Sequence, residues 1–361
     1  MQKPKPMPNY QIKLTPVDTY FFGGEKHKLE SNQLKADYFV ESNLYPQQTT
    51  LLGMLRYYLL FRDENLLNKN SNSDARKKAT ELIGNKSFAY NGANQFGKIQ
   101  SISPLYFLHQ SKPYFFAPFD YNFNYKEGSL TNKDGKAFNA KEHYSRISKQ
   151  QIINGKEPKE ISAIIKDVDH TGNKKAKSGK SQLEGYYKMT KKKLDEGWSF
   201  AFDAAIDLDT LDREANYVHL GGEKSIFKTE FKKIAHFNKA ILPKKYVRTG
   251  SSFIYFTSDA FIKNEDLKAV DFAVNQFVSF RCMQSSTETA NYNNLPKQRS
   301  DKGILLDKKE VIKKGLFRSC RNQLIKRGSV FYLDANEKDK LAETLKNTPV
   351  HKFGFNHYLK N

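Results

Sequence analysis

The sequence contains few cysteines and none of the short motifs that mark a zinc or nucleotide site. Its two cysteines, Cys282 and Cys320, lie far apart among 361 residues and form no Cys-x-x-Cys pair. Sparse, separated cysteines fit the reducing cytoplasm and argue against a zinc module. A His-x-x-x-His pair, a Walker loop and a Gly-x-Gly-x-x-Gly run are also missing. We therefore expect a cytoplasmic protein with no metal site and no bound cofactor.

Long apolar segments are absent as well. The longest apolar stretch, residues 51–61, is interrupted by Arg56, and it is far shorter than the roughly 20 residues that a helix needs to cross a bilayer. Residues 1–8 carry positive charge without an apolar run behind them, which is unlike a secretory signal. No stretch places a basic face opposite a clean apolar one, and no lipidation signal is present. We expect no contact with a membrane.

Acidic residues are in the minority, and this imbalance is the first positive indication of function. Sixty Lys and Arg residues stand against 39 Asp and Glu residues, which gives a formal net charge of +21. A compact body this basic repels itself unless it lies against something acidic, so nucleic acid is the favoured partner. The alternative, in which the lysines serve only solubility, stays open. Hydrophobic residues at 38%, with 27 Phe and 20 Tyr, exclude a disordered chain.

The length of the chain predicts two domains, and composition indicates their limits. Residues 1–123 and 197–361 alternate strand-like and helical patterns, which predicts an α+β fold. Residues 124–196 are rich in Lys, Gly, Asn and Ser, so we expect an insertion or a flexible basic arm without a fixed core. In the second domain we expect strands near 198–207, 225–231, 251–257 and 329–333, and helices over 265–280 and 339–345.

The most informative segment is residues 39–56, where an extended run leads into a helix. Pro46 ends the extended run, and Thr49 or Thr50 is expected to cap the helix. Gly53 and Arg56 fall away from the apolar face, and a helical glycine costs about 1 kcal/mol relative to alanine, so we expect a phosphate backbone to approach there. The alternative is a glycine that packs the helix on a sheet beside a solvated arginine. Helical spacing predicts a buried face formed by Leu51, Leu52, Leu55, Tyr58 and Leu59.

A second basic segment, residues 281–327, interleaves cations with aromatic rings. This mixture is expected where phosphates are paired and bases stack. Arg318 and Arg321 would share one face if their stretch is helical. An equally open alternative is a loop that docks onto a neighbouring protein. The candidate RNA-binding residues are Arg281, Tyr292, Arg299, Arg318 and Arg321, and the other cations of the segment include Lys302, Lys313, Lys314, Lys326 and Arg327.

Several segments, taken together and in order, resemble a known family. They are residues 14–22, 45–56, 103–108 with 117–120, 220–224, and 328–333 with 353–356. Their order and spacing are similar to those of the third subunit of the Cmr module, the type III-B CRISPR effector complex. The resemblance covers nearly the whole chain except the lysine-rich residues 124–196.

This resemblance implies a member of the RAMP superfamily with two ferredoxin-like, RRM-related domains. Such subunits bind the 5′ repeat-derived tag of the CRISPR RNA and cap one end of the guide filament, in antiviral defence. They dock against the large polymerase/cyclase-type subunit, and backbone subunits form the rest of the filament. The family also implies a subunit without catalysis of its own, because target cutting is assigned to the backbone subunits and nucleotide signalling to the large subunit.

Position by position, the resemblance places Gly53 and Arg56 on the family's first helix, beside the RNA tag. Gly221, Gly222 and Lys224 match its Gly-Gly-Glu-basic loop. Paired glycines let backbone N–H groups turn toward phosphates, and a neighbouring lysine adds charge. A tight connection between two strands is the alternative interpretation of this loop.

The C-terminal residues depart from the family pattern. RAMP proteins commonly end in a loop with several glycines, whereas Gly354 alone lies between Phe353 and Phe355. This departure weakens the expectation of a loop that wraps RNA closely. We expect Lys352 to supply charge and Phe353 to supply a stacking face for single-stranded RNA.

Related RAMP proteins include endoribonucleases that cleave repeat RNA, so catalysis is weighed separately. A metal-independent nuclease needs a general base, usually histidine, near a 2′-hydroxyl. The candidates are His27, His219, His351 and His357, and none belongs to a diagnostic motif. Three hypotheses stand: a non-catalytic subunit that binds the RNA tag, an endoribonuclease that processes CRISPR repeat RNA, and a basic scaffold that binds only proteins. We favour the first and expect no catalytic residue.

Overall fold

The computed structural model describes residues 7–28, 38–67, 73–126, 128–132, 134–139, 149–175, 178, 181–211, 216–241, 252–285 and 316–361. The chain divides into two compact units, each built from three stretches of sequence. Unit 1 comprises Met1–Tyr58, Leu105–Ala117 and Lys149–Ala240, and unit 2 comprises Leu59–Pro104, Pro118–Ser148 and Ile241–Asn361. We expected contiguous domains with limits near residues 123 and 196, whereas these units interleave along the chain.

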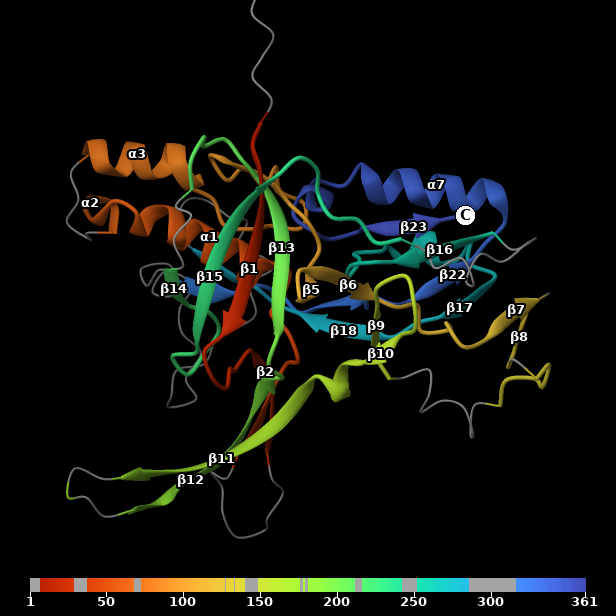
Figure 1. Ribbon diagram of the computed structural model, residues 1–361, viewed down its shortest axis with the longest axis horizontal. Coiled ribbons are helices and arrows are strands. Elements are labelled where there is room, and N and C mark those ends of the chain that lie inside the picture. Colours follow the sequence, from red (N-terminus) through yellow and green to blue (C-terminus); the bar gives the residue numbers. More distant parts are fainter. Residues whose placement is uncertain are drawn as a thin grey trace, which may run out of the picture. The chain divides into compact units, whose positions relative to one another are not determined.

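The main sheet of unit 1 has the strand order β10-β9-β6-β5-β13-β1-β15-β14 (Figure 1). The neighbours in this order pair antiparallel. The strands are β1 (Asn9–Pro16), β5 (Tyr106–His109), β6 (Lys112–Phe116), β9 (Gln151–Ile153), β10 (Lys159–Glu160), β13 (Trp198–Ile206), β14 (Asn216–His219) and β15 (Ile226–Ile234). In β1, Ile12 and Leu14 are fully buried. Every residue of β13 is buried as well, so this central strand is covered on both faces.

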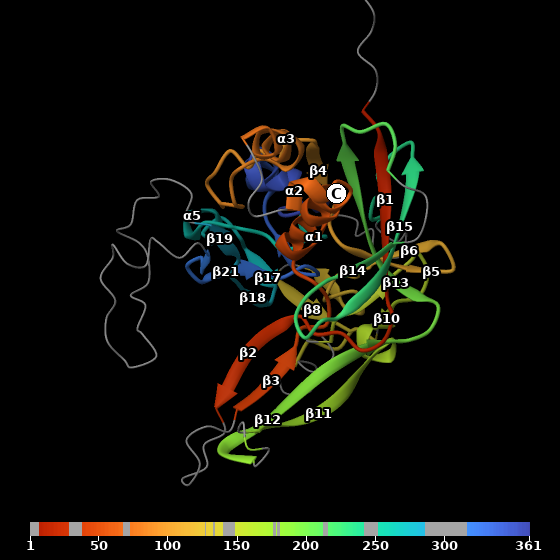
Figure 2. The same ribbon diagram turned by 90° about the vertical axis from the view of Figure 1, so that its left-hand side faces the viewer.

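A second sheet of unit 1 has the order β11-β12-β3-β2 (Figure 2). Its strands are β2 (Gly23–Lys28), β3 (Tyr38–Ser42), β11 (Ile165–Lys175) and β12 (Ser181–Leu194). The hairpin of β11 and β12 lies within the segment for which we expected no fixed core. That expectation was wrong for this part, because Met189 is buried beside Phe21 and Val40. The dense lysines hid the alternation of buried and exposed positions along β12.

Lys192 of β12 is the clearest example. Its side chain is 2% exposed, and its ammonium pairs with Glu41 at 2.6 Å and with Asp167 at 2.7 Å. Burial alone would lower the pKa of Lys192, but hydrogen bonds to Asp167 and Glu41, with their charges, outweigh burial and raise it. A lysine that composition assigned to a basic arm therefore joins β12 to β3 and β11.

The sheet of unit 2 has the order β17-β22-β16-β23, again antiparallel throughout. Its strands are β16 (Phe253–Phe256), β17 (Phe272–Val274), β22 (Val330–Tyr332) and β23 (Tyr358–Lys360). Helix α7 (Ala335–Lys346) covers one face, and Asp334 caps it by accepting from the N–H groups of Asn336 and Glu337. The helix packs Leu341 and Leu345 against the sheet. On the other face, Tyr125 stacks on Tyr332 with ring centroids 3.7 Å apart.

The two units share one strand order. In unit 1, β1 is followed by helix α1 (Gln48–Phe61) and then by β5, β13 and β15, and these strands lie side by side as β5-β13-β1-β15. In unit 2, β16 is followed by α5 (Asn264–Leu267), β17, β22, α7 and β23, which lie as β17-β22-β16-β23. Counted along the chain, both sets have the order 2-3-1-4. The fold is α+β as predicted, and its repeat is one of topology, which the sequence did not reveal.

The remaining elements are short. They are α2 (Glu64–Leu67), α3 (Ser73–Ile83), β4 (Ile99–Ile102), β7 (Asn124–Lys126), β8 (Ser129–Thr131), the 3₁₀ turns η1 (Ile161–Ala163) and η5 (Pro349–Lys352), β18 (Phe277–Phe280), β19 (Met283–Ser285), β20 (Leu316–Arg318) and β21 (Asn322–Ile325). Among the described residues, no helix is both long enough and apolar enough to span a bilayer.

The predicted helix over 265–280 was wrong. Only α5 is helical there, and β17 and β18 follow it. The Phe and Val residues of this stretch recur at two-residue as well as helical spacing, and aromatic and β-branched residues favour strands. The four predicted strands of this half correspond to β13, β15, β16 and β22, and the helix predicted over 339–345 lies within α7.

A buried ion pair lies at the edge of the unit 2 sheet. Arg327 is 1% exposed, and its Nη2 and Nε lie 2.8 Å and 3.0 Å from the carboxylate of Asp259. The Arg327 backbone N–H also donates to this carboxylate, at 3.0 Å. Burial alone would raise the pKa of Asp259, but the charge and hydrogen bonds of Arg327 outweigh burial and lower it. We grouped Arg327 with cations that face phosphate, whereas it serves the fold.

Replacing Asp259 with alanine should lower the free energy of unfolding by about 3–5 kcal/mol, because a buried guanidinium loses its carboxylate. Urea denaturation of the full-length chain at neutral pH measures this loss. The contribution of the pair should also disappear as pH falls through the lowered pKa of Asp259. The matched control is Asp339→Ala, since Asp339 pairs with Lys360 in an exposed position and should matter far less. Equal losses in the two variants would contradict this assignment.

Candidate nucleic-acid interface

Helix α1 presents an open stripe on the side away from its core. Leu51, Leu52, Leu55, Tyr58 and Leu59 are buried, as the spacing predicted. Gly53 is exposed, and a Cβ added there would meet no atom within 4 Å. Tyr57 and Phe61 follow at four-residue steps and are 49% and 58% exposed. The interpretation of Gly53 as a packing residue is therefore wrong, because no atom of the described residues uses the space that its missing side chain leaves.

Arg56 lies beside this stripe and is half-buried. Burial lowers the pKa of its guanidinium, although an arginine stays charged at neutral pH. A partly desolvated guanidinium interacts more strongly with a phosphate than a fully hydrated one does, because the local dielectric is lower. The solvated Arg56 of the alternative interpretation is not what the structure shows.

The start of α1 is fixed by its neighbours in unit 1. The hydroxyl of Tyr20 donates to the carbonyl of Leu44 at 2.7 Å, and the hydroxyl of Tyr45 donates to Gln150 at 2.9 Å. The helix begins at Gln48, so Thr49 and Thr50 lie within its first turn. The prediction that one of them caps the helix was wrong.

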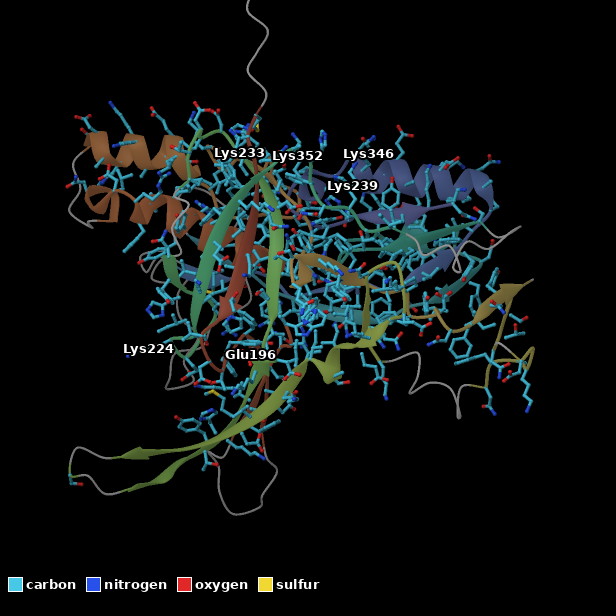
Figure 3. All side chains as sticks on the ribbon, in the orientation of Figure 1. Glu196, Lys224, Lys233, Lys239, Lys346 and Lys352 are labelled. Atoms are coloured by element: carbon cyan, nitrogen blue, oxygen red, sulfur yellow. The ribbon has the colours of Figure 1, made fainter. Side chains whose placement is uncertain are left out.

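The Gly-Gly-Glu-Lys loop joins β14 to β15 as a hairpin connection. Gly221 has a φ of +87°, and a Cβ there would lie 2.4 Å from the carbonyl oxygen of Phe21. The N–H of Gly222 donates to that same oxygen at 2.7 Å. The glycines are therefore required by the close approach of Phe21, and the N–H of Gly222 is not turned outward as the phosphate interpretation expected. Lys224 is exposed in this loop and has a φ of 54° (Figure 3).

Two short ribbons in unit 2 bring three predicted arginines together. We call β18 with β21, β19 with β20 and the residues between them the arginine ribbon. Phe280 pairs with Asn322, and Met283 pairs with Arg318. Arg281 follows Phe280 and Arg321 precedes Asn322, so both arginines lie next to the same end of the β18–β21 ladder. All three arginines, Arg281, Arg318 and Arg321, are exposed.

The surface of the arginine ribbon is apolar as well as cationic. Phe277 is 60% exposed and Met283 is 55% exposed. The Nε of Arg321 donates to the hydroxyl of Ser279 at 2.6 Å, which holds its guanidinium on the face that Phe277 shares. The condition under which Arg318 and Arg321 would share a helical face is not met, because Arg318 lies in β20 and Arg321 directly precedes β21. The remaining predicted residues, Tyr292 and Arg299, lie outside the described residues, as do Lys302, Lys313 and Lys314.

The C-terminal residues have different surroundings. Phe353 is 3% exposed and packs edge-on against Phe96, with ring centroids 4.8 Å apart. The expectation of a stacking face at Phe353 was therefore wrong, because its ring belongs to the core of unit 2. Lys352 is exposed next to it. Figure 3 labels further exposed lysines, Lys233 and Lys239 in unit 1 and Lys346 in unit 2.

The histidine candidates serve packing at the C-terminus. His351 and His357 stack with ring centroids 4.1 Å apart, and Nε2 of His357 lies 2.8 Å from the carbonyl oxygen of His351. Burial lowers the pKa of His351 and, with the nearby His351, lowers that of His357 to about 3. His219 is exposed at the end of β14, and the side chain of His27 lies outside the described part. Within the described ranges, no three His, Cys, Asp or Glu side chains gather as metal ligands.

Sequence reasoning missed the exposed aromatic residues of these surfaces. Tyr57 lies one helical turn beyond Gly53, so the spacing alone would have revealed it. Phe277 had no usable signal, because the wrong helix placed it on a buried face.

The two kinds of glycine should respond oppositely to alanine. Gly53→Ala should raise the free energy of unfolding by up to about 1 kcal/mol, because the helix interior gains a better helix former and the site has space. Gly221→Ala should lower it by about 1–3 kcal/mol, because alanine resists a left-handed φ and would clash with Phe21. Urea denaturation of both variants measures the difference. A loss of stability in Gly53→Ala would show that its surroundings are not open.

Comparison with known proteins adds to this geometry. The family model described as CRISPR-associated protein (Cas_Cmr3) matches residues 12–189 and 131–360. No curated protein matches the sequence. A chain in a cryo-EM structure of the Type III-B Cmr-beta bound to cognate target RNA is similar at 14% identity with a TM-score of 0.50, over 97% of this chain and 96% of that one. At this identity the likeness concerns the fold alone.

Two further structures have lower scores. A Cmr-beta structure with cognate target RNA and AMPPnP matches at a TM-score of 0.47 and 14% identity, over 97% and 96% of the two chains. A Csm3-Csm4 subcomplex of the type III-A interference complex matches at 0.33 and 12%, over 90% and 92%. The family model spans nearly the whole sequence and confirms the resemblance to the Cmr module. The chain thus belongs to the Cas_Cmr3 family of CRISPR-associated proteins.

Proposed function

We propose that this chain is a non-catalytic subunit of a type III-B CRISPR ribonucleoprotein that binds the 5′ repeat-derived tag of the CRISPR RNA. In this role it caps the guide filament next to the large polymerase/cyclase-type subunit and the adjoining backbone subunit. We also propose that each four-strand set of order 2-3-1-4 is a ferredoxin-like domain. Its family and the open stripe of α1 support this proposal.

The observation that carries the proposal is the bare helix surface at Gly53. A helical glycine that no neighbour requires is a cost to stability, and a phosphodiester backbone is a partner that gains from close approach to a helix surface. Arg56 stands one turn away with its guanidinium partly desolvated, so it can pair with the phosphate that reaches the glycine. Tyr57 offers an exposed ring to an adjacent base.

The arginine ribbon supports a second region of contact. It combines three exposed guanidinium groups with the exposed ring of Phe277, which is the pairing of charge and stacking that single-stranded RNA needs. Of the cations that composition offered, Lys192 and Arg327 are buried and pair with carboxylates of the same chain. Arg281, Arg318 and Arg321 are exposed instead, so a phosphate can reach them.

The packing of the histidines supports a binding role rather than repeat cleavage. His351 and His357 stack on each other, and their lowered pKa values favour the neutral rings. A stacked, buried pair of neutral rings is poorly suited to take a proton from a bound 2′-hydroxyl.

Removal of the α1 contacts should weaken RNA binding without loss of fold. Full-length protein is titrated with labelled RNA that begins with the repeat-derived tag, over a series of salt concentrations. Arg56→Ala should weaken binding about tenfold and reduce the salt slope by about 0.7, the value for one phosphate on a single strand. Gly53→Ala should weaken binding as well, although it stabilises the helix. The RNA should stay uncut throughout.

The matched control is Arg76→Ala, which removes an exposed arginine from helix α3. It should leave affinity and slope nearly unchanged. Unchanged affinity in both Arg56→Ala and Gly53→Ala would remove α1 from the interface, and specific metal-independent cleavage would replace the proposal with an endoribonuclease.

Removal of the three arginines of the arginine ribbon should weaken RNA binding through the loss of phosphate contacts. A triple variant, Arg281→Ala with Arg318→Ala and Arg321→Ala, should reduce the salt slope by about 2, because three phosphate contacts are lost. A control with three exposed helical cations removed, Arg76, Lys77 and Lys346, should change the slope much less. If the triple variant binds RNA normally but no longer binds the large subunit, the ribbon is a protein-docking surface and its RNA role is wrong.

A further inference from the structure

Unit 2 contains a pocket of about 480 Å³, and of the predicted RNA contacts only Lys352 and Phe353 line it. It lies between the C-terminal end of α3, the loop of residues 84–100 and Lys352 with Phe353. Two glycines in left-handed conformations shape its wall. A Cβ at Gly84 would lie 2.4 Å from the carbonyl oxygen of Gln95, and a Cβ at Gly97 would lie 2.5 Å from that of Glu81. Both positions exclude a side chain, so the spacing of the wall is fixed.

Amide side chains dominate the lining. Asn94 is 7% exposed, and its side chain accepts from the N–H of Ala89 at 2.9 Å and donates to the carbonyl of Ala89 at 2.7 Å. The Nε2 of Gln100 donates to the carbonyl of Gly97 at 2.8 Å, which orients its Oε1. Asn85 and Gln95 add two exposed amides. The wall is therefore held in place before any ligand arrives.

Two charged residues and an aromatic pair complete the pocket. Glu81 supplies a carboxyl group and Lys352 an ammonium group, both from exposed side chains. Phe96 and Phe353 lie beneath as a buried edge-to-face pair. The pocket thus combines hydrogen-bond donors and acceptors with an apolar floor, the usual composition of a small-ligand site.

This chemistry favours a nucleobase over a phosphate. The C-terminal end of a helix carries partial negative charge, and α3 ends at the pocket next to Glu81, so this end of the pocket disfavours a phosphate. Amides both donate and accept, as the edges of bases do, and unstacked bases are read by such contacts over apolar or aromatic surfaces. A carboxylate accepts from the amino group of adenine, cytosine or guanine, whereas uracil presents two carbonyl oxygens at its edge.

We propose that this pocket binds one nucleobase and prefers a base with an exocyclic amino group over uracil. The base belongs either to a nucleotide splayed out of bound RNA or to a free nucleotide. The first possibility, a base of bound RNA, rests on the proposed function, whereas the second, a free nucleotide, does not. In either case the amides and Glu81 read the edge of the base, and Lys352 faces its carbonyl oxygen or its phosphate.

Titration of the full-length protein with AMP, CMP, GMP and UMP tests the pocket directly, with ribose 5-phosphate as the probe that lacks a base. Binding is followed by calorimetry or saturation-transfer NMR. The amino-bearing nucleotides should bind about tenfold more tightly than UMP, since one good base contact gives about that discrimination. Ribose 5-phosphate should not bind measurably. Equal binding of all five probes, or of none, would overturn the proposal.

Substitutions in the lining then test whether the nucleotides bind in this pocket. Gln95→Ala should weaken nucleotide binding about fivefold or more, and Glu81→Gln should reduce the preference over UMP. The controls Asn122→Ala and Glu196→Gln remove an exposed amide and an exposed carboxyl group elsewhere and should change neither. Unchanged binding in Gln95→Ala and Glu81→Gln, with melting temperatures preserved, would also overturn the proposal.

The same variants are titrated with tag RNA. A parallel loss of RNA affinity assigns the pocket to a base of the RNA, and a loss confined to mononucleotides assigns it to a free nucleotide. If the wild-type chain fails to bind tag RNA but still selects nucleotides in the expected order, the proposed function fails and the pocket stands. If it binds tag RNA and ignores every nucleotide, the pocket fails and the proposed function stands.

Discussion

A buried ammonium between two carboxylates is the constraint on which the candidate interface of unit 1 depends. Lys192 joins the lysine-rich hairpin to Glu41 and Asp167, and Glu41 lies on the strand that leads to α1. A buried charge that keeps both partners is tolerated, whereas one that loses them is costly. The pairing therefore ties a segment of weak apolar pattern to the strand before the functional helix. Helix α1, which carries Gly53, follows this strand in the chain.

The excess of positive charge is divided between two tasks. Some cations are internal, as Lys192 and Arg327 are, and their partners are carboxylates of the same chain. Others, such as Arg281 and Arg318, are exposed on short ribbons beside large apolar side chains. The net charge of the chain counts both groups of cations together and does not distinguish them. The structure is needed to separate the cations that hold the fold from those that face a partner.

The sequence predicted correctly those elements whose apolar residues fit only one spacing, either helical or alternating. The buried face of α1 was predicted correctly, because one face of this helix is apolar. The prediction of a helix over 265–280 was wrong, because the apolar residues there fit both the helical spacing and the alternating spacing of a strand. Pairing with other strands in the folded chain favours the extended conformation. Phe353 was misplaced because nothing in its neighbours shows that Phe96, far away in sequence, covers it. Gly53 and Gly221 looked alike in sequence, and only the atoms around them show that one is required by the fold and the other is not.

In the proposed function, RNA lies against the open face of α1. Photo-crosslinking of tag RNA to the full-length chain, followed by mass spectrometry of the crosslinked peptides, tests this contact at residue level. We expect crosslinks within residues 48–61, with Tyr57 the principal site, and their loss when excess unlabelled tag RNA competes. Crosslinks that spare this helix and fall only on other basic surfaces would contradict it.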